Sequence, residues 1–161
     1  MSKLTHLDGE GRAKMVDVSG KASTLRTAVA HGTLACESGT LDQVRTGAAP
    51  KGSVVRTAEL AGIMAAKRTA ELIPLCHPLP LTKIEVRIDM DDSLPGFRVA
   101  AEVRTEGVTG VEMEALTAVS VACLTLFDML KAIDRSMVIG GVEVASKTGG
   151  NSGDWQRSGQ A

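Results

Sequence analysis

An α+β fold is predicted for this chain, with an antiparallel sheet and two long helices packed on one of its faces. Residues 82–90 and 97–105 alternate apolar and polar side chains, and the turn between them predicts an antiparallel hairpin. A helical period precedes this hairpin and another follows it, and one further strand is expected at each side. The order strand, helix, strand, strand, helix, strand is the ferredoxin-like split βαβ plan.

Each expected element has its own signal. The first strand is rich in Thr, Val and Ala, and the short helix after it ends before Gly47. Ser53 is expected to cap the next helix, in which Leu60, Ile63 and Met64 follow a 3.6-residue period. The long helix is rich in Ala, Leu, Met and Val. In chain order we expect a strand at 25–36, a short helix at 38–45, a helix from 53 to about 72, strands at 82–90 and 97–105, a helix at 110–133 and a strand at 137–145.

The length of 161 residues favours one domain. Residues 1–13 and 149–161 are polar, contain glycine and show no periodicity, so we expect a flexible N-terminus and a flexible C-terminal tail. Residues 14–148 are expected to form a single domain.

Charge and composition exclude several classes of partner. The 18 basic and 19 acidic residues give a net charge of −1, so no global field recruits nucleic acid or a membrane. With two Phe, one Trp and no Tyr, the chain also lacks the aromatic residues on which single-stranded nucleic acid stacks. Cys36, Cys76 and Cys123 are odd in number and widely spaced, which is typical of a reducing compartment. A cytoplasmic protein without nucleic-acid or membrane partners is expected.

Residues 73–81 place Cys76 and His77 in a segment that three prolines stiffen. Such a loop loses little further entropy when it binds a ligand. Adjacent side chains of an extended segment point apart, so no metal site is expected here. The alternative is a rigid connector from helix to strand, with a solvated histidine.

The helix expected at 110–133 is apolar on most of its circumference, and small residues such as Ala115, Ala118 and Ala122 are interleaved along it. A helix in a two-layer domain normally keeps a polar outer stripe. We therefore expect a second subunit to cover it, since burial within one subunit is hard to build from one sheet and one other long helix.

The few charges of this helix are informative. Asp128 and Lys131 are three residues apart and share a face at ion-pair distance, although an ordinary surface pair would look the same. Glu112 and Glu114 lie in the first turn, where the helix dipole alone is a sufficient reason for them. Fourteen residues separate Glu114 from Asp128, which is about 21 Å along a helix at about 1.5 Å per residue. If both carboxylates are functional, the sites must be shared between subunits.

Two turns have the composition of anion sites. Pro50-Lys51-Gly52-Ser53 precedes a helix N-terminus, and Lys147 stands beside Gly149 and Gly150. Neither matches the Walker pattern, which argues against a GTP-binding protein of that kind. Both lysines can also be read as solvated loop residues.

Together these segments closely resemble one family, that of the cyclic pyranopterin monophosphate synthases of molybdenum cofactor biosynthesis. The resemblance covers about residues 14–154, and its most specific blocks surround Cys76-His77 and Glu112-Met113-Glu114. The segments that carry it are Met15-Val16-Asp17-Val18, 58–81, 110–117, 127–132 and 147–150.

The resemblance implies a lyase that converts 3′,8-cyclo-7,8-dihydroguanosine 5′-triphosphate to cyclic pyranopterin monophosphate and releases diphosphate. It also implies a ferredoxin-like fold and a homo-oligomer, a hexamer built as a trimer of dimers, with shared sites. No cofactor is required by it, and an Mg²⁺ requirement is left open.

The family's acid/base positions fall on Asp128 and Lys131. Its substrate-binding positions fall on Leu75, Cys76, His77, Met113 and Glu114, with Glu112, Lys51 and Lys147 lining the site. Three residues depart from the family pattern. Phe127 and Leu130 stand where Tyr and Cys are frequent, and Asn151 stands where Lys is usual, which removes a phosphate contact at that position. A non-catalytic oligomeric module that binds a small molecule is the competing function, but it leaves the Asp128–Lys131 pair unexplained.

Overall fold

The computed structural model describes residues 5–49 and 53–158, so Lys51 lies outside the described residues. The elements are β1 (Thr24–Ala35), α1 (Ser38–Arg45), α2 (Val54–Ala66), α3 (Thr69–Leu72), β2 (Leu81–Asp91), β3 (Gly96–Gly107), α4 (Glu112–Leu130), β4 (Val138–Thr148) and β5 (Trp155–Gln156).

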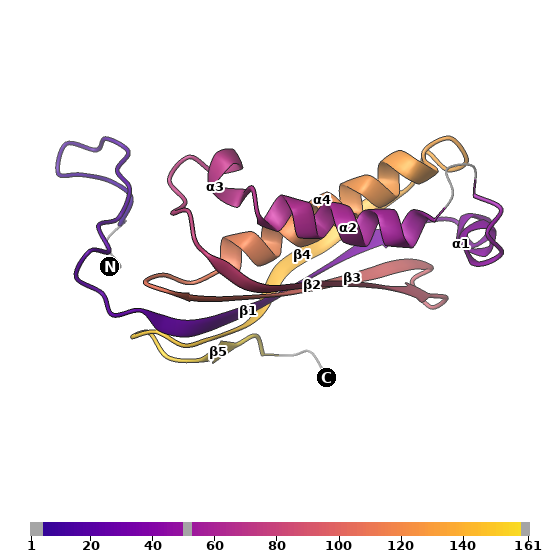
Figure 1. Cartoon of the computed structure of the whole chain (residues 1–161). Helices are drawn as coiled ribbons and strands as arrows, with labels where there is room; N and C mark the ends of the chain where they lie inside the picture. The colour runs from indigo at the N-terminus through magenta and orange to yellow at the C-terminus, as the bar shows by residue number, and fades with distance from the viewer. Residues whose placement is uncertain (1–4, 50–52, 159–161) are drawn as a thin grey trace.

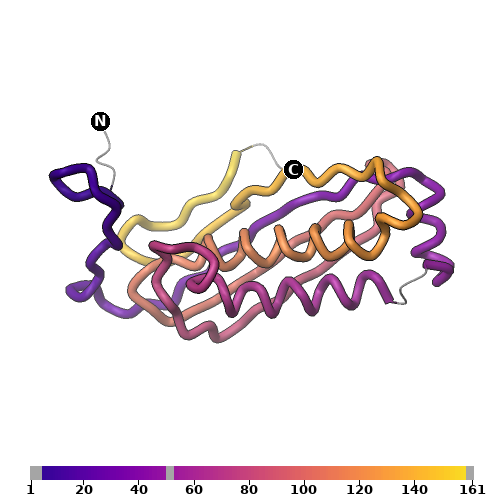
Figure 2. The backbone as a smooth tube through the Cα atoms, turned by 90° about the horizontal axis from the view of Figure 1, so that it is seen from above, coloured from indigo at the N-terminus to yellow at the C-terminus, as the bar shows by residue number. Residues whose placement is uncertain are grey.

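The strands form one antiparallel sheet in the order β2-β3-β1-β4-β5. The helices α2 and α4 lie side by side on one face of it (Figure 1 and Figure 2). In this layer α2 packs on β2, whereas α4 packs on β1, β3 and β4. The predicted α+β class, the hairpin and the placement of the two long helices on one face are therefore confirmed.

Three local features differ from the sequence prediction. The helix expected to run to Leu72 stops at Ala66 and resumes as α3, because the buried Thr69 turns its hydroxyl back to the Ala66 carbonyl, 2.9 Å away. Ser53 precedes α2 but makes no side-chain capping bond. Within the segment 149–161, β5 pairs with the end of β4, and nothing in the sequence pattern predicted a strand there.

The core lies between the sheet and the helices. The strand residues that point to the helices are buried, among them Ala30, Leu34, Phe97 and Val103. For β3 this alternation is the one that the sequence predicted, whereas the first strand had been predicted from its composition alone.

Burial of much of α4 within one subunit, which the sequence argument held hard to build, does occur, and coverage of the rest by a second subunit stays a prediction. Nine of its residues are buried within this one chain, including all three small residues Ala115, Ala118 and Ala122. Small side chains let α2 and the sheet approach α4 closely. The exposed apolar remainder of α4 includes Met113 and Leu124. By length and composition alone α4 would also span a membrane, but a buried core helix passes the same test, and this is weak evidence.

Gly62 marks the closest approach of α2 to α4. A Cβ atom built there would lie 2.9 Å from the Ala118 carbonyl oxygen and 3.3 Å from the Ala122 Cβ. Gly39 in α1 has open space at the same position.

We predict opposite effects of the same substitution at these two glycines. Gly39→Ala should raise the free energy of unfolding by up to about 1 kcal/mol through helix propensity. Gly62→Ala should lower it by about 1 kcal/mol or more, because overpacking against a backbone oxygen outweighs that gain. Urea unfolding measures both, and a stabilised Gly62→Ala protein would contradict the packing.

Asp134 anchors the end of α4 to α1. Its carboxylate accepts hydrogen bonds from the Glu37 N–H (2.9 Å), the Thr40 hydroxyl (3.2 Å), the Ser136 N–H (2.8 Å) and the Ser136 hydroxyl (2.7 Å). Only 4% of the residue is exposed. Burial raises the pKa of this carboxyl, but the four hydrogen bonds outweigh burial and hold the pKa below its ordinary value.

Candidate functional site

The proline loop brings Cys76 to the first turn of α4. The loop folds back through a hydrogen bond from the Cys76 N–H to the Ile73 carbonyl (3.0 Å), and the Cys76 Sγ lies 3.8 Å from Oε1 of Glu114. Two residues that are 38 positions apart in the sequence are thus neighbours, as the sequence analysis required of the site. Leu75, just before them, is half-buried.

Glu114 is a buried carboxyl group. It is 3% exposed, and its Oε2 has no hydrogen-bond partner within the described ranges. Burial raises the pKa of this carboxyl, and the nearby charge of Glu112 raises it further. Glu114 therefore keeps a proton to a higher pH than an ordinary glutamate, which suits a group that exchanges protons with a ligand.

Cys76 is a thiol with a raised pKa. Burial, and then the charge of Glu114, raise its pKa to about 11. A thiol of this kind is a weak nucleophile at neutral pH. Its place in the site is that of a small half-buried contact residue.

We predict that Glu114→Gln makes Cys76 more reactive. The substitution removes the charge that opposes the thiolate, so its pKa should fall, although burial will keep it above the ordinary value. Alkylation by iodoacetamide at pH 8, followed by peptide mass spectrometry, measures the rate at Cys76. Cys123 has a pKa of about 11 from burial alone and serves as the internal control. An unchanged rate at Cys76 would contradict the coupling.

His77 links the site to the segment before β1. Its Nε2 lies 2.8 Å from the Val16 carbonyl oxygen. A carbonyl oxygen only accepts, so Nε2 carries the proton of this bond. The contact brings residues 15–18, which the family resemblance included, beside the proline loop.

Lys147 completes the lining on the sheet side. Its Nζ lies 3.0 Å from Oε1 of Glu112, and about a third of the lysine side chain is exposed. Glu112 itself folds back over Gly110, where any Cβ atom would collide with the carboxylate.

Arg26 is a candidate site residue that the sequence analysis did not include. It is half-buried on β1, and it donates through Nε to the Gly107 carbonyl (2.9 Å) and through Nη2 to the Val108 carbonyl (3.3 Å). Within the described chain it forms no ion pair, so its positive charge is not neutralised. Gly150 lies over the guanidinium, where a Cβ atom would be 2.1 Å from Nη1, and its φ of +80° favours glycine at this position.

A signal for Arg26 was present in the sequence. Arg26 is two and four residues from Ala28 and Ala30, so its side chain lies on the same side of β1 as these core residues. A cation on the buried side of a strand is rare without a function or a partner.

These residues form what we call the N-terminal cluster of α4. It comprises Arg26, Cys76, His77, Glu112, Glu114 and Lys147. Met113 lies in the same helical turn and is 38% exposed. Asn151 follows the glycine turn and is exposed. Among the described residues, no three His, Cys, Asp or Glu side chains converge as metal ligands.

Asp128 and Lys131 form what we call the C-terminal pair of α4. The Lys131 Nζ lies 2.6 Å from Oδ1 of Asp128, as their spacing predicted, and more than half of each side chain is exposed. The pair lies at the other end of the helix from the N-terminal cluster (Figure 1). One chain therefore does not bring all the predicted site residues together.

Comparison with known proteins gives a consistent result. The MoaC family model matches residues 15–150. A cyclic pyranopterin monophosphate synthase of Nostoc sp. strain PCC 7120 is 58% identical over 154 residues, which cover 96% of this chain and 92% of the relative. Proteins of the same name from Methylobacterium sp. strain 4-46 and Brucella ovis are each 60% identical, and the alignments cover 96% and 95% of this chain and 97% and 93% of those relatives.

Proposed function

Since this chain belongs to the MoaC family, we infer that it is a lyase of molybdenum cofactor biosynthesis. It converts 3′,8-cyclo-7,8-dihydroguanosine 5′-triphosphate to cyclic pyranopterin monophosphate and diphosphate. A nucleotide-derived substrate is supported by the N-terminal cluster of α4, where cations, a buried acid and a helix N-terminus converge.

The N-terminal cluster is the substrate-binding half of the proposed site. Arg26 and Lys147 face the same end of α4, whose free backbone N–H groups also favour anions. Their combined charge stabilises the phosphates and the leaving diphosphate. Cys76, His77 and Glu114 then face the part of the substrate that is rebuilt. Lys51 is proposed as a further phosphate ligand on the family pattern alone.

The C-terminal pair is the proton-transfer half. Opening a purine ring and closing a pterin ring require repeated proton transfers, for which a carboxylate and an amine in contact are suited. However, Asp128 lies about 21 Å along the helix from Glu114. The complete site therefore combines the N-terminal cluster of one subunit with the C-terminal pair of another.

The outer stripe of α4 supports this sharing. Met113, Thr117, Val121, Leu124 and Asp128 recur every three or four residues, so they lie on one face of the helix. Leu124 is 58% exposed, and none of the five is buried. The stripe joins the two halves of the proposed site.

Val121 is midway between Glu114 and Asp128. If two copies of α4 cross antiparallel near Val121, Glu114 of one subunit comes level with Asp128 of the partner subunit. Beside Val121 there is a hollow of about 450 Å³, lined also by Met64 and Leu72, where side chains of a partner can pack. A two-fold contact here makes two complete sites at once.

We expect a homo-oligomer in solution, and a hexamer built as a trimer of dimers is the proposed form. Sedimentation velocity at micromolar concentration measures it. A stable monomer under these conditions would overturn both the assembly and the shared site.

The activity itself is tested with purified protein and the cyclised GTP substrate. Mass spectrometry should detect cyclic pyranopterin monophosphate, and an enzymatic assay should detect an equal amount of diphosphate. Arg26→Met should weaken substrate binding, whereas Arg104→Met, at an exposed position of β3 outside both halves of the proposed site, should not. A folded oligomer that binds the substrate without converting it would refute the function.

The fold and the location of the protein belong to the same proposal. The strand order with β2 and β4 flanking β3 and β1 supports a ferredoxin-like plan extended by β5. Residues 14–148 are proposed as the catalytic domain. All three cysteines are free thiols, which is consistent with the cytoplasm.

A further inference from the structure

The strand β2 presents one long free edge. It spans eleven residues and lies at the end of the sheet, where only β3 pairs with it within the described chain. A long exposed edge is a template for another strand unless charges or a covering segment protect it.

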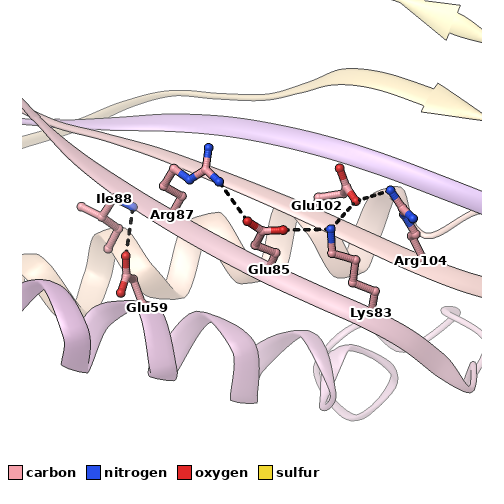
Figure 3. Close-up of polar contacts among 7 residues, drawn as sticks. All are labelled: Glu59, Lys83, Glu85, Arg87, Ile88, Glu102 and Arg104. Atoms are coloured by element: carbon pink, nitrogen blue, oxygen red, sulfur yellow. Dashed lines mark hydrogen bonds and ion pairs between the residues drawn. The ribbon is translucent and has the colours of Figure 1, made fainter.

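A hydrogen bond shows which backbone groups face outward. The Ile88 N–H donates to the Glu59 Oε1 of α2 at 3.3 Å, so this N–H points away from β3 (Figure 3). Successive residues of a strand point their backbone groups to opposite sides. The N–H and C=O groups of Ile84 and Val86 therefore also point outward.

The charged residues of β2 alternate along the strand with Ile84, Val86 and Ile88. Lys83, Glu85, Arg87 and Asp89 alternate in sign along the strand, and the first three follow one another in Figure 3. They bond within the strand, with Glu85 lying 2.8 Å from Lys83 and 3.0 Å from Arg87. The four charges sum to zero, so a partner can cover them without burying net charge.

We propose that β2 pairs antiparallel with β2 of a second copy of this chain, across a two-fold axis at Val86. In this register Glu85 lies opposite Arg87 of the partner subunit, and Lys83 lies opposite Asp89 of the partner subunit. Every cross-strand charge pair is then attractive, and each occurs twice. The outward groups of Ile84 meet those of Ile88 of the partner subunit.

The neighbouring registers are unfavourable. A shift of the axis to Glu85 places two glutamates opposite each other and sets Lys83 against Arg87. A shift to Arg87 places two arginines together and sets Glu85 against Asp89. Like charges directly opposite destabilise a strand pair. Charge therefore favours the register about Val86 over these two, and in it the outward backbone groups of β2 face those of the second copy.

The surface beside the β2 edge leaves room for the strand of a second copy. A hollow of about 500 Å³ runs beside it, lined by residues of α2 and β2 that include Val55, Glu59 and Met90. In the single chain Glu59 satisfies the Ile88 N–H. On pairing, that N–H passes to a carbonyl of the second copy, and Glu59 keeps its ion pair with Arg56 at 3.0 Å.

This contact is separate from the α4 stripe, because α2 packs on β2 whereas α4 packs on the other strands. Two different two-fold contacts that alternate around a ring close it with an even number of subunits. The β2 contact is thus the second interface that an assembly larger than a dimer needs.

Charge reversal tests the contact. Glu85→Arg or Arg87→Glu alone places like charges opposite each other twice, and we expect the association constant to fall at least about tenfold. The double variant Glu85→Arg/Arg87→Glu restores opposite charges and should regain the parent assembly. Sedimentation velocity measures the assembly size, and circular dichroism confirms folding.

Glu106→Arg, at an exposed position of β3 one strand in from the edge, is the matched control and should leave assembly unchanged. The contact is refuted if the single reversals assemble like the parent, or if the folded double variant fails to recover. Turnover is a separate readout, since none of these residues belongs to the proposed site. A loss of turnover without a change in assembly would concern the site and not this contact.

Discussion

Replacing Asp128 by asparagine is expected to slow single-turnover formation of cyclic pyranopterin monophosphate by roughly 10²- to 10⁴-fold, the usual contribution of general acid/base catalysis. Asparagine keeps the size and the hydrogen bond to Lys131 but cannot take a proton at neutral pH. Because more than half of the Asp128 side chain is exposed, the melting temperature and the assembly should change little. Lys131→Met should behave similarly.

The control is a matched pair on α1. Asp42 and Arg45 are also three residues apart, with Oδ1 of Asp42 2.7 Å from Nη1 of Arg45 and both side chains exposed. Asp42→Asn therefore removes an equivalent ion pair and should leave turnover unchanged. Near-normal turnover of a folded Asp128→Asn protein would make Asp128–Lys131 an ordinary ion pair and pass the proton transfers to His77 or Glu114.

Asp134→Ala is expected to cause the largest loss of stability, about 3 kcal/mol in the free energy of unfolding. It leaves the Glu37 N–H, the Thr40 hydroxyl and the Ser136 N–H without their acceptor in a buried place. Urea unfolding at pH 7 measures the loss. A change below about 0.5 kcal/mol would contradict the role of Asp134 as the anchor between α4 and α1.

Asp91→Ala is the control for this anchor. Asp91 makes the same kind of turn, with Oδ1 accepting from the Ser93 N–H and hydroxyl, but it lies at the β2–β3 hairpin, is less buried than Asp134 and also pairs with Arg98. Its loss should therefore cost much less stability.

The pH dependence has a defined sign. Folding lowers the pKa of Asp134 below the ordinary value of 3.8, so its contribution is complete above that pH and is lost as the pH falls through the folded pKa. The difference in stability between the parent and Asp134→Ala should shrink in acid. A difference that grows in acid would contradict the assignment.

Much of the fold could be predicted from local pattern. Alternation identified β2 and β3, since one face of a covered sheet must be apolar, and composition identified β1. The break after Ala66 could not be predicted, because it depends on Thr69 being buried, where its hydroxyl takes a backbone carbonyl. The apolar circumference of α4 was read as a subunit interface, but α2 and the sheet cover most of it through close contacts at Gly62 and the alanines.

The candidate site could be predicted in its types of residue but only partly in its arrangement. Spacing along one helix predicted the contact of Asp128 with Lys131 and its separation from Glu114, because helical geometry is local. The contacts of Cys76 with Glu114 and of Lys147 with Glu112 join residues far apart in sequence, and the family resemblance grouped them. The one signal of Arg26 in the sequence is its position on the same side of β1 as Ala28 and Ala30, because its partners are backbone carbonyls, which no sequence pattern reveals.

The central claim is that each site combines the two ends of α4 from different subunits. The most direct test mixes two impaired variants, Lys147→Ala at the N-terminal cluster and Asp128→Asn at the C-terminal pair. In a two-fold contact, each mixed pair of subunits contains one site with both halves intact. Equal random mixing should therefore restore about a quarter of the parent activity.

The reference for this test is the double variant Lys147→Ala/Asp128→Asn mixed with the Asp128→Asn protein, which contains no intact site and should stay inactive. Subunit exchange is followed with two affinity tags, so that mixed oligomers are isolated before the assay. Isolated mixed oligomers, in which some chains carry only Lys147→Ala and the others only Asp128→Asn, should recover turnover far above either single variant alone. Mixed oligomers whose activity stays at the average of the two impaired variants would contradict the shared site, because each site would then lie within a single chain.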